Sequence, residues 1–139
     1  MSSSSHGTGL KPVHADGIHP PFSNYNHAIE IPAGARLLVC SGQLGIDATG
    51  TIPEDGAAQV RLCFENIGAI LKGGGMDFGD IVRLNAYVTD REIWADYMRL
   101  RDEFTHDPRP ASTLMMVSGF TREDFRIEIE ALAAKVEAS

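Results

Sequence analysis

Two stretches near the C-terminus decide the fold of this chain: Asp107-Pro108-Arg109-Pro110-Ala111-Ser112-Thr113-Leu114-Met115-Met116-Val117 and Arg126-Ile127-Glu128-Ile129-Glu130-Ala131. Each has the composition of a β-strand, and the two are predicted to pair in one sheet. In the second stretch apolar residues alternate with Glu128 and Glu130, which puts both carboxylates on one face of the strand. That face is either open to water or lines a site that uses a carboxylate. The alternation alone favours the solvated alternative.

The composition is that of a soluble globular protein, with 139 residues of which 43% are hydrophobic and 22% are charged. The net charge of −7 argues against a nucleic-acid-binding surface, which needs clustered lysines and arginines. The chain has no apolar run long enough to cross a membrane and no signal-peptide pattern, so a cytoplasmic location is expected. Cys40 and Cys63 lie in apolar segments and are expected to be buried, reduced thiols. The histidines lack the spacing of metal ligands, and no metal or other cofactor is expected.

The domain organisation follows from the apolar pattern. Residues 1–17 have no periodic apolar residues and are predicted to be a flexible lead-in, followed by a single domain over residues 18–139. Apolar residues alternate or run continuously where we expect strands, and recur every three to four residues where we expect helices. The expected order is a strand at 28–32, a strand at 36–41, a helix at 56–72, a strand at 81–89, a helix at 90–104, and the two strands quoted above.

This order predicts an α+β fold. In the strand at 81–89, the residues Val82, Leu84, Ala86 and Val88 are predicted to share one face. Two amphipathic helices are enough to cover one face of a single mixed sheet. The opposite face then needs a cover, and the simplest cover is another copy of the same chain.

A set of short motifs follows along the domain: Asn24-Tyr25-Asn26-His27-Ala28, Leu38-Val39-Cys40-Ser41-Gly42-Gln43, Ala57-Ala58-Gln59-Val60 with Glu65-Asn66-Ile67, Pro110-Ala111-Ser112-Thr113, and Ile127-Glu128-Ile129-Glu130-Ala131. In this order, from about Tyr25 to Ala134, they resemble the RidA/YjgF family. The resemblance implies a fold like that of a small chorismate mutase and a homotrimer with small-molecule pockets at the subunit interfaces. It also implies imine or enamine deaminase activity, which converts 2-aminoacrylate-type intermediates to 2-keto acids and ammonia without a cofactor.

The resemblance also assigns roles to individual residues. Glu128 takes the position of the carboxylate that orients the attacking water, which favours a pocket over a solvated face. Tyr25 and the Ser41-Gly42 pair match the substrate pocket, although Tyr25 is equally suited to be a core aromatic. Glu130 is expected to be structural.

Three positions depart from the family pattern. In deaminating members an arginine that binds the substrate carboxylate follows the Pro-Ala pair, and here that position is Ser112. A hydroxyl cannot replace a bidentate guanidinium–carboxylate pair. The cysteine of the family falls at Leu114, and an asparagine of the second helix falls near Met98. Arg109 is a candidate for an alternative anion anchor, but a solvent-exposed arginine after a proline-rich turn is the favoured interpretation.

The sequence therefore predicts a RidA-like enamine or imine hydrolase in which Glu128 orients water. Because Ser112 removes the carboxylate-binding arginine, activity on 2-aminoacrylate is expected to be weak or absent. The alternative is a trimer that binds a metabolite without converting it. Endoribonuclease activity is a weaker alternative, since the acidic chain has no basic stripe for RNA.

Overall fold

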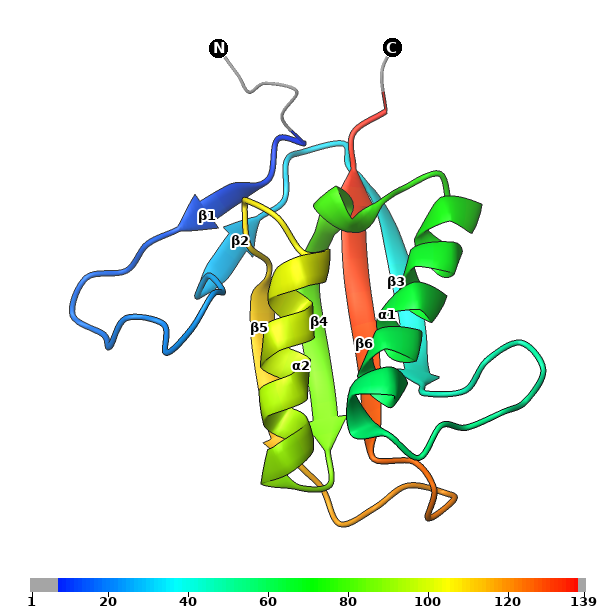
Figure 1. Cartoon of the computed structure of the whole chain (residues 1–139). Helices are drawn as coiled ribbons and strands as arrows, with labels where there is room; N and C mark the ends of the chain where they lie inside the picture. Colours follow the sequence, from blue (N-terminus) through cyan, green and yellow to red (C-terminus); the bar gives the residue numbers. More distant parts are fainter. Residues whose placement is uncertain (1–7, 138–139) are drawn as a thin grey trace.

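The computed structural model describes residues 8–137. Its centre is a four-stranded sheet with two helices on one face (Figure 1). Strands β4 and β5 run parallel, and the other neighbouring pairs run antiparallel, so the sheet is mixed. The predicted α+β fold is confirmed. Across the sheet the strands are β3 (Arg36–Leu44), β6 (Ile127–Lys135), β4 (Ile81–Val88) and β5 (Ala111–Met116).

Helices α1 (Gly56–Gly73) and α2 (Arg91–Phe104) form the second layer, and a short 3-10 helix η1 (Phe78–Asp80) precedes β4. Both long helices begin at an aspartate that accepts a hydrogen bond from a backbone N–H of the first turn, Asp55 for α1 and Asp90 for α2. Their apolar stripes face the sheet, as the periodicity predicts. The buried residues on these stripes are Val60, Cys63, Phe64, Ile67 and Leu71 of α1 and Ile93, Tyr97 and Leu100 of α2.

The C-terminal stretches 107–117 and 126–131 do not pair with each other, because β4 lies between β5 and β6. Helix α2 is the crossover that carries the chain from β4 to the edge of the sheet, where β5 runs parallel to β4. The chain then returns as β6 and pairs antiparallel with both β3 and β4. Both strands exist as predicted, but the prediction that they pair directly is wrong.

A separate two-stranded ribbon is formed by β1 (Lys11–Val13) and β2 (Ala28–Glu30). Leu10 beside this ribbon is buried in a small second cluster with Val82 and Ala134. The predicted flexible lead-in is therefore wrong for residues 11–13, and its residues 1–7 lie outside the described range. The pattern missed β1 because three residues are too few for a period to be recognised.

Strand β4 departs from strict alternation at its start. Its register with β6 shifts between Ile81 and Arg83, and Ile81 packs into the main core while Val82 joins the second cluster. Leu84, Ala86 and Val88 share the helix-covered face as predicted, but Val82 does not.

The face of the sheet away from the helices carries exposed apolar side chains. Leu37, Val39 and Met115 are 55%, 78% and 54% exposed. Val39 lies opposite Leu132 of β6, and both belong to this face. We refer to it as the open face.

The remaining predictions about the core concern the thiols. Cys40 and Cys63 are buried and free, as predicted. Burial raises the pKa of each thiol, so both are protonated near neutral pH. Within residues 8–137, no helix combines the length and the apolar character that crossing a bilayer requires.

Candidate functional site

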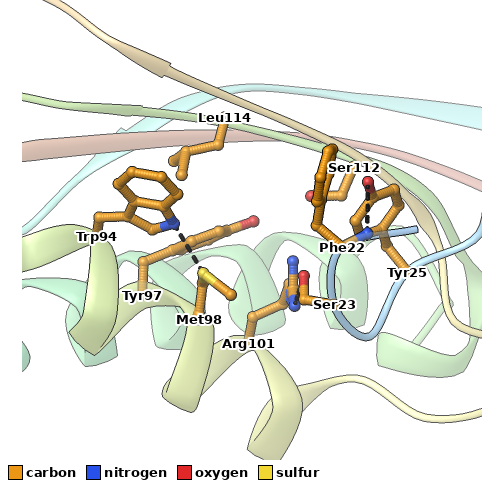
Figure 2. A pocket seen from close by; sticks show the side chains of 9 residues that line it. All are labelled: Phe22, Ser23, Tyr25, Trp94, Tyr97, Met98, Arg101, Ser112 and Leu114. Carbon is orange, nitrogen blue, oxygen red and sulfur yellow. Dashed lines mark hydrogen bonds between the residues drawn. The ribbon is translucent and has the colours of Figure 1, made fainter. Parts of the chain in front are cut away.

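A cavity of about 210 Å³ lies between helix α2 and strand β5 (Figure 2). It is smaller than the ~300–1,000 Å³ pockets that hold drug-sized ligands, so it suits a small metabolite. Four of the residues predicted from the sequence line it: Tyr25, Met98, Ser112 and Leu114. The wall is completed by five residues that were not predicted as site residues: Phe22, Ser23, Trp94, Tyr97 and Arg101.

Strand β5 turns Ser112 and Leu114 toward the helices. Ser112 lies opposite Leu84 of β4, and Leu114 lies opposite Ala86. Leu84 and Ala86 are fully buried under the helices. Side chains of paired positions share a face of the sheet, so Ser112 and Leu114 point into the space below α2.

Asn26 fixes the loop that brings Tyr25 to the cavity. Its backbone N–H donates to the carbonyl oxygen of Pro110 at 3.2 Å, and its side-chain Nδ2 donates to the carbonyl oxygen of Arg109 at 2.7 Å. The loop thus runs beside the start of β5. The Tyr25 hydroxyl accepts a hydrogen bond from the backbone N–H of Phe22 at 3.2 Å, which leaves its own proton for another acceptor.

Among the described residues that line the cavity, Arg101 has the only charged side chain. Its side chain is 4% exposed. Nη2 donates to the Ser23 hydroxyl at 3.1 Å, and Nε and Nη2 both lie 3.3 Å from one carboxylate oxygen of Asp102. The guanidinium carbon also lies 5.8 Å from the centre of the Tyr97 ring. The sequence held a signal for this placement, because Arg101 is eight residues after Ile93 and four after Tyr97, on the buried stripe of α2.

Tyr97 is fully buried, and within residues 8–137 its hydroxyl has no hydrogen-bond partner. Figure 2 shows this hydroxyl pointing into the cavity in the direction of Ser112. Burial raises the pKa of Tyr97, while the neighbouring Ser112 and Arg101 act in the opposite direction. The phenol is therefore neutral at physiological pH, and an unpaired buried hydroxyl of this kind costs roughly 1–3 kcal/mol.

Glu128 does not line this cavity. It pairs with Leu44 of β3 and Tyr87 of β4, and it projects from the open face of the sheet. Gly42 lies directly beside it, since a Cβ added at position 42 would come within 2.7 Å of the Glu128 carboxyl carbon. Among the described residues, none donates a hydrogen bond to Glu128. The Glu128 side chain is half-buried. Its carboxylate is therefore available to a ligand or to water.

Glu130, on the same face, is engaged differently. Its Oε1 accepts hydrogen bonds from the Tyr87 hydroxyl at 2.7 Å and from Asn85 Nδ2 at 3.1 Å. The hydrogen bond between the Tyr87 hydroxyl and Glu130 is the largest cause of the raised pKa of Tyr87. Glu130 thus has the structural role that the sequence suggests, with a tyrosine and an asparagine as its partners.

Arg109 lies outside the cavity wall. Its Nη1 donates to the carbonyl oxygens of Asp102 at 3.2 Å and Thr105 at 3.0 Å, and to the Thr105 hydroxyl at 3.1 Å. The cation therefore satisfies carbonyls at the C-terminal end of α2, where the helix dipole also favours positive charge. The structure does not place Arg109 as an anion anchor of the cavity.

A sequence model of the family described as Endoribonuclease L-PSP matches residues 18–135, nearly the whole chain. The chain belongs to the RidA/YjgF family. A RutC family protein of Pasteurella multocida is 32% identical over 130 residues, which cover 90% of this chain and 98% of that protein. A 2-iminobutanoate/2-iminopropanoate deaminase of Salmonella typhimurium is 33% identical, with 71% of this chain and 80% of the enzyme covered.

The fold comparison agrees with the sequence comparison. A crystal structure of YyfB from Yersinia pestis, a protein of the Rid family, superposes with a TM-score of 0.70 and 26% identity. The superposition covers 89% of this chain and 97% of that one.

In this RidA/YjgF chain the predicted site residues other than Arg109 form two separate groups. The cavity group consists of Tyr25, Met98, Ser112 and Leu114, and the strand group consists of Ser41, Gly42 and Glu128. The sheet lies between them, because Ser112 points to the helices and Glu128 to the open face. Within residues 8–137, no cluster of three or more His, Cys, Asp or Glu side chains is placed to hold a metal ion.

The close approach of Gly42 to Glu128 gives a prediction for Gly42→Ala. The added methyl group occupies the space of the Glu128 side chain, whose Cδ and Cγ would lie 2.7 Å and 2.8 Å away. Because a flexible side chain gives way more easily than backbone, we expect an unchanged free energy of unfolding. A displacement of a catalytic group by about 1 Å is enough to lower a turnover rate by roughly a hundredfold.

The measurement is the steady-state rate together with denaturant unfolding. Gly119→Ala is the matched control, since a Cβ at Gly119 meets nothing within 4 Å. A Gly42→Ala variant with wild-type turnover would show that the position of Glu128 does not matter.

Proposed function

We propose that this protein is a cofactor-independent imine or enamine hydrolase that acts as a homotrimer. The observation that carries the proposal is the placement of Glu128. Its carboxylate is half-buried beside Gly42 with no donor from the described chain, while Oε1 of the neighbouring Glu130 accepts two hydrogen bonds. A carboxylate presented in this way is suited to general-base catalysis. The identity to a named 2-iminobutanoate/2-iminopropanoate deaminase supports the same chemistry.

The proposed reaction is hydrolysis of a carbon–nitrogen double bond. Glu128 accepts a proton from water as the water oxygen bonds to the imine carbon, and the π electrons move to nitrogen, which takes up a proton. In the resulting carbinolamine the hydroxyl proton is transferred to the amino nitrogen, the carbon–nitrogen bond breaks as the carbon–oxygen double bond forms, and ammonia leaves a carbonyl compound behind. An enamine enters the same sequence after proton transfer to its carbon. Overall, one water is consumed and one ammonia is released.

The separation of the two groups supports assembly with other copies of the chain, and the family resemblance implies three. The cavity group lies at the β5 edge of the sheet, and the strand group lies between β6 and the opposite edge strand β3. A head-to-tail contact between copies brings unlike edges together, and such contacts form a ring when the rotation between copies closes on itself. The exposed Leu37, Val39 and Met115 supply apolar surface for the contact. We propose that each active site combines the cavity group of one copy with the strand group of the next.

The proposal is tested with an imine generated in situ by an amino-acid oxidase. The expected result is that the protein removes the imine faster than it decays in buffer and releases one equivalent of ammonia. If a ligand stays bound without chemical change over long incubation, the protein is instead a metabolite-binding trimer.

The endoribonuclease activity in the name of the family model receives less support. The chain has a net charge of −7, and Arg101 is the only basic side chain in the cavity wall. RNA binding relies on several phosphate contacts from lysine and arginine.

We further propose a cytoplasmic location, because two buried free thiols are compatible with a reducing compartment.

A further inference from the structure

We infer that Arg101, with the hydroxyls of Tyr97 and Ser112, binds the carboxylate of the substrate. The anchor that strand β5 lacks at position 112 is then supplied by helix α2. The inference rests on the proposed function and names its substrate class, namely small imines and enamines that carry a carboxylate. It reverses the sequence-based expectation that Ser112 excludes such substrates.

The first support is the charge of the cavity. Eight of the nine described lining residues are uncharged, so Arg101 contributes the one charged side chain of the described cavity wall. The two contacts to Asp102 are long, at 3.3 Å, and come from Nε and Nη2. Asp102 also accepts a hydrogen bond from Asn24 at 3.0 Å, so its charge is shared. Nη1 of Arg101 takes no part in these contacts, which leaves a donor and part of the positive charge for a ligand.

The second support is a hydroxyl group on the same helix. The Tyr97 hydroxyl is fully buried, lacks a partner within residues 8–137, and points into the cavity. Buried hydroxyls are almost always paired, so an unpaired one at a cavity wall indicates a polar ligand. Ser112 and Arg101 lie close enough to Tyr97 to oppose the effect of burial on its pKa. Two hydroxyls and a guanidinium thus surround one end of the cavity, and these hydrogen-bond donors complement the acceptor oxygens of a carboxylate.

The other end of the cavity is apolar. This end is lined by Trp94, Met98 and Leu114. The Nε1–H group of Trp94 already donates a hydrogen bond to the Met98 sulfur at 2.7 Å. A carboxylate at the Arg101 end therefore leaves the apolar end for a short alkyl or aryl side chain. The volume of about 210 Å³ fits an acid of this size.

A competing explanation is that Arg101 only ties the loop containing Ser23 to α2. A structural arginine would affect stability but would not discriminate between an acid and its amide. The test is therefore equilibrium binding of benzoate and of benzamide, which have nearly the same shape. The chain has one tryptophan, and it lines the cavity, so its fluorescence reports occupancy.

We expect the wild type to bind benzoate at least tenfold more tightly than benzamide. Arg101→Gln should weaken benzoate binding by roughly ten- to a hundredfold, as expected for loss of a charge-assisted contact, and should leave benzamide binding unchanged. Arg99→Gln, an exposed arginine on the same helix, is the matched control and should bind both probes as the wild type does. Tyr97→Phe should weaken benzoate binding while raising the melting temperature, because it removes an unpaired hydroxyl.

Moving the guanidinium provides a rescue. In Arg101→Gln with Ser112→Arg, the charge returns to the cavity from strand β5, and we expect benzoate selectivity to recover. If Arg101→Gln does not fold, the ratio of benzoate affinity to benzamide affinity is measured in Arg101→Lys and in Tyr97→Phe instead. A benzoate preference that survives in the Arg101 and Tyr97 variants overturns the inference, as does a wild type that prefers benzamide. Because binding needs no turnover, this result is distinguishable from failure of the proposed hydrolase activity.

Discussion

Glu128→Gln is expected to lower the proposed imine hydrolysis by about two to four orders of magnitude, the range in which a general base contributes to catalysis. The amide has nearly the shape of the carboxylate but cannot accept the proton of the attacking water. The side chain of Glu128 is half-buried at the open face, so the expected change in unfolding free energy is small. Steady-state rates and denaturant unfolding of the same preparation measure both quantities.

Glu130→Gln is the matched control, because Glu130 lies on the same strand and the same face. Its hydrogen bonds with Tyr87 and Asn85 connect β6 to β4, and an amide oxygen can still accept them. We expect turnover of the same order as that of the wild type. Equal losses in the two variants would indicate that the open face needs negative charge in general, and wild-type turnover in Glu128→Gln would remove Glu128 from the mechanism.

We expect Val39→Asp to convert the proposed trimer into monomers and to reduce the proposed imine hydrolysis to the uncatalysed rate. Val39 is 78% exposed in the single chain, so the aspartate is tolerated by the fold. In the proposed trimer the same position is covered by another copy, where an unpaired carboxylate costs several kcal/mol. Sedimentation equilibrium measures the assembly and the imine assay measures the activity.

Ala69→Asp introduces the same charge on the exposed side of α1, away from the sheet. This control should remain a trimer with wild-type turnover. A Val39→Asp protein that stays trimeric would place the interface elsewhere, and an active monomer would show that one chain holds a complete site.

Local patterns in the sequence predict the elements well. The stripe from Val60 to Leu71 identifies α1, and the alternation around Glu128 identifies β6, because each depends only on which neighbours face inward. The order of the strands depends on where the α2 crossover delivers the chain, which no local period records. For the same reason the insertion of β4 between β5 and β6 was not predicted.

The site shows a similar division. The sequence and its family resemblance place Tyr25, Ser112 and Leu114 in one wall, and the structure brings them together. The sequence and the resemblance do not reveal that Glu128 points to the other face of the sheet. The face on which its side chain lies relative to Ser112 depends on the register of β4 with both of its neighbours. Arg101 was missed because a charged residue is normally assigned to the solvent side of a helix, although its spacing from Tyr97 indicates the inward face.

The central claim is that each active site is shared by two copies of the chain, and mixing inactive variants tests it most directly. One variant is Glu128→Gln, and the other is whichever of Tyr25→Ala and Leu114→Trp is inactive alone. The two are denatured together in equal amounts and refolded. If the sites are shared, about one quarter of them receive an intact cavity group and an intact strand group, and about one quarter of wild-type activity returns. A mixture as inactive as its two parents would contradict the claim, because each chain would then carry its own damaged site.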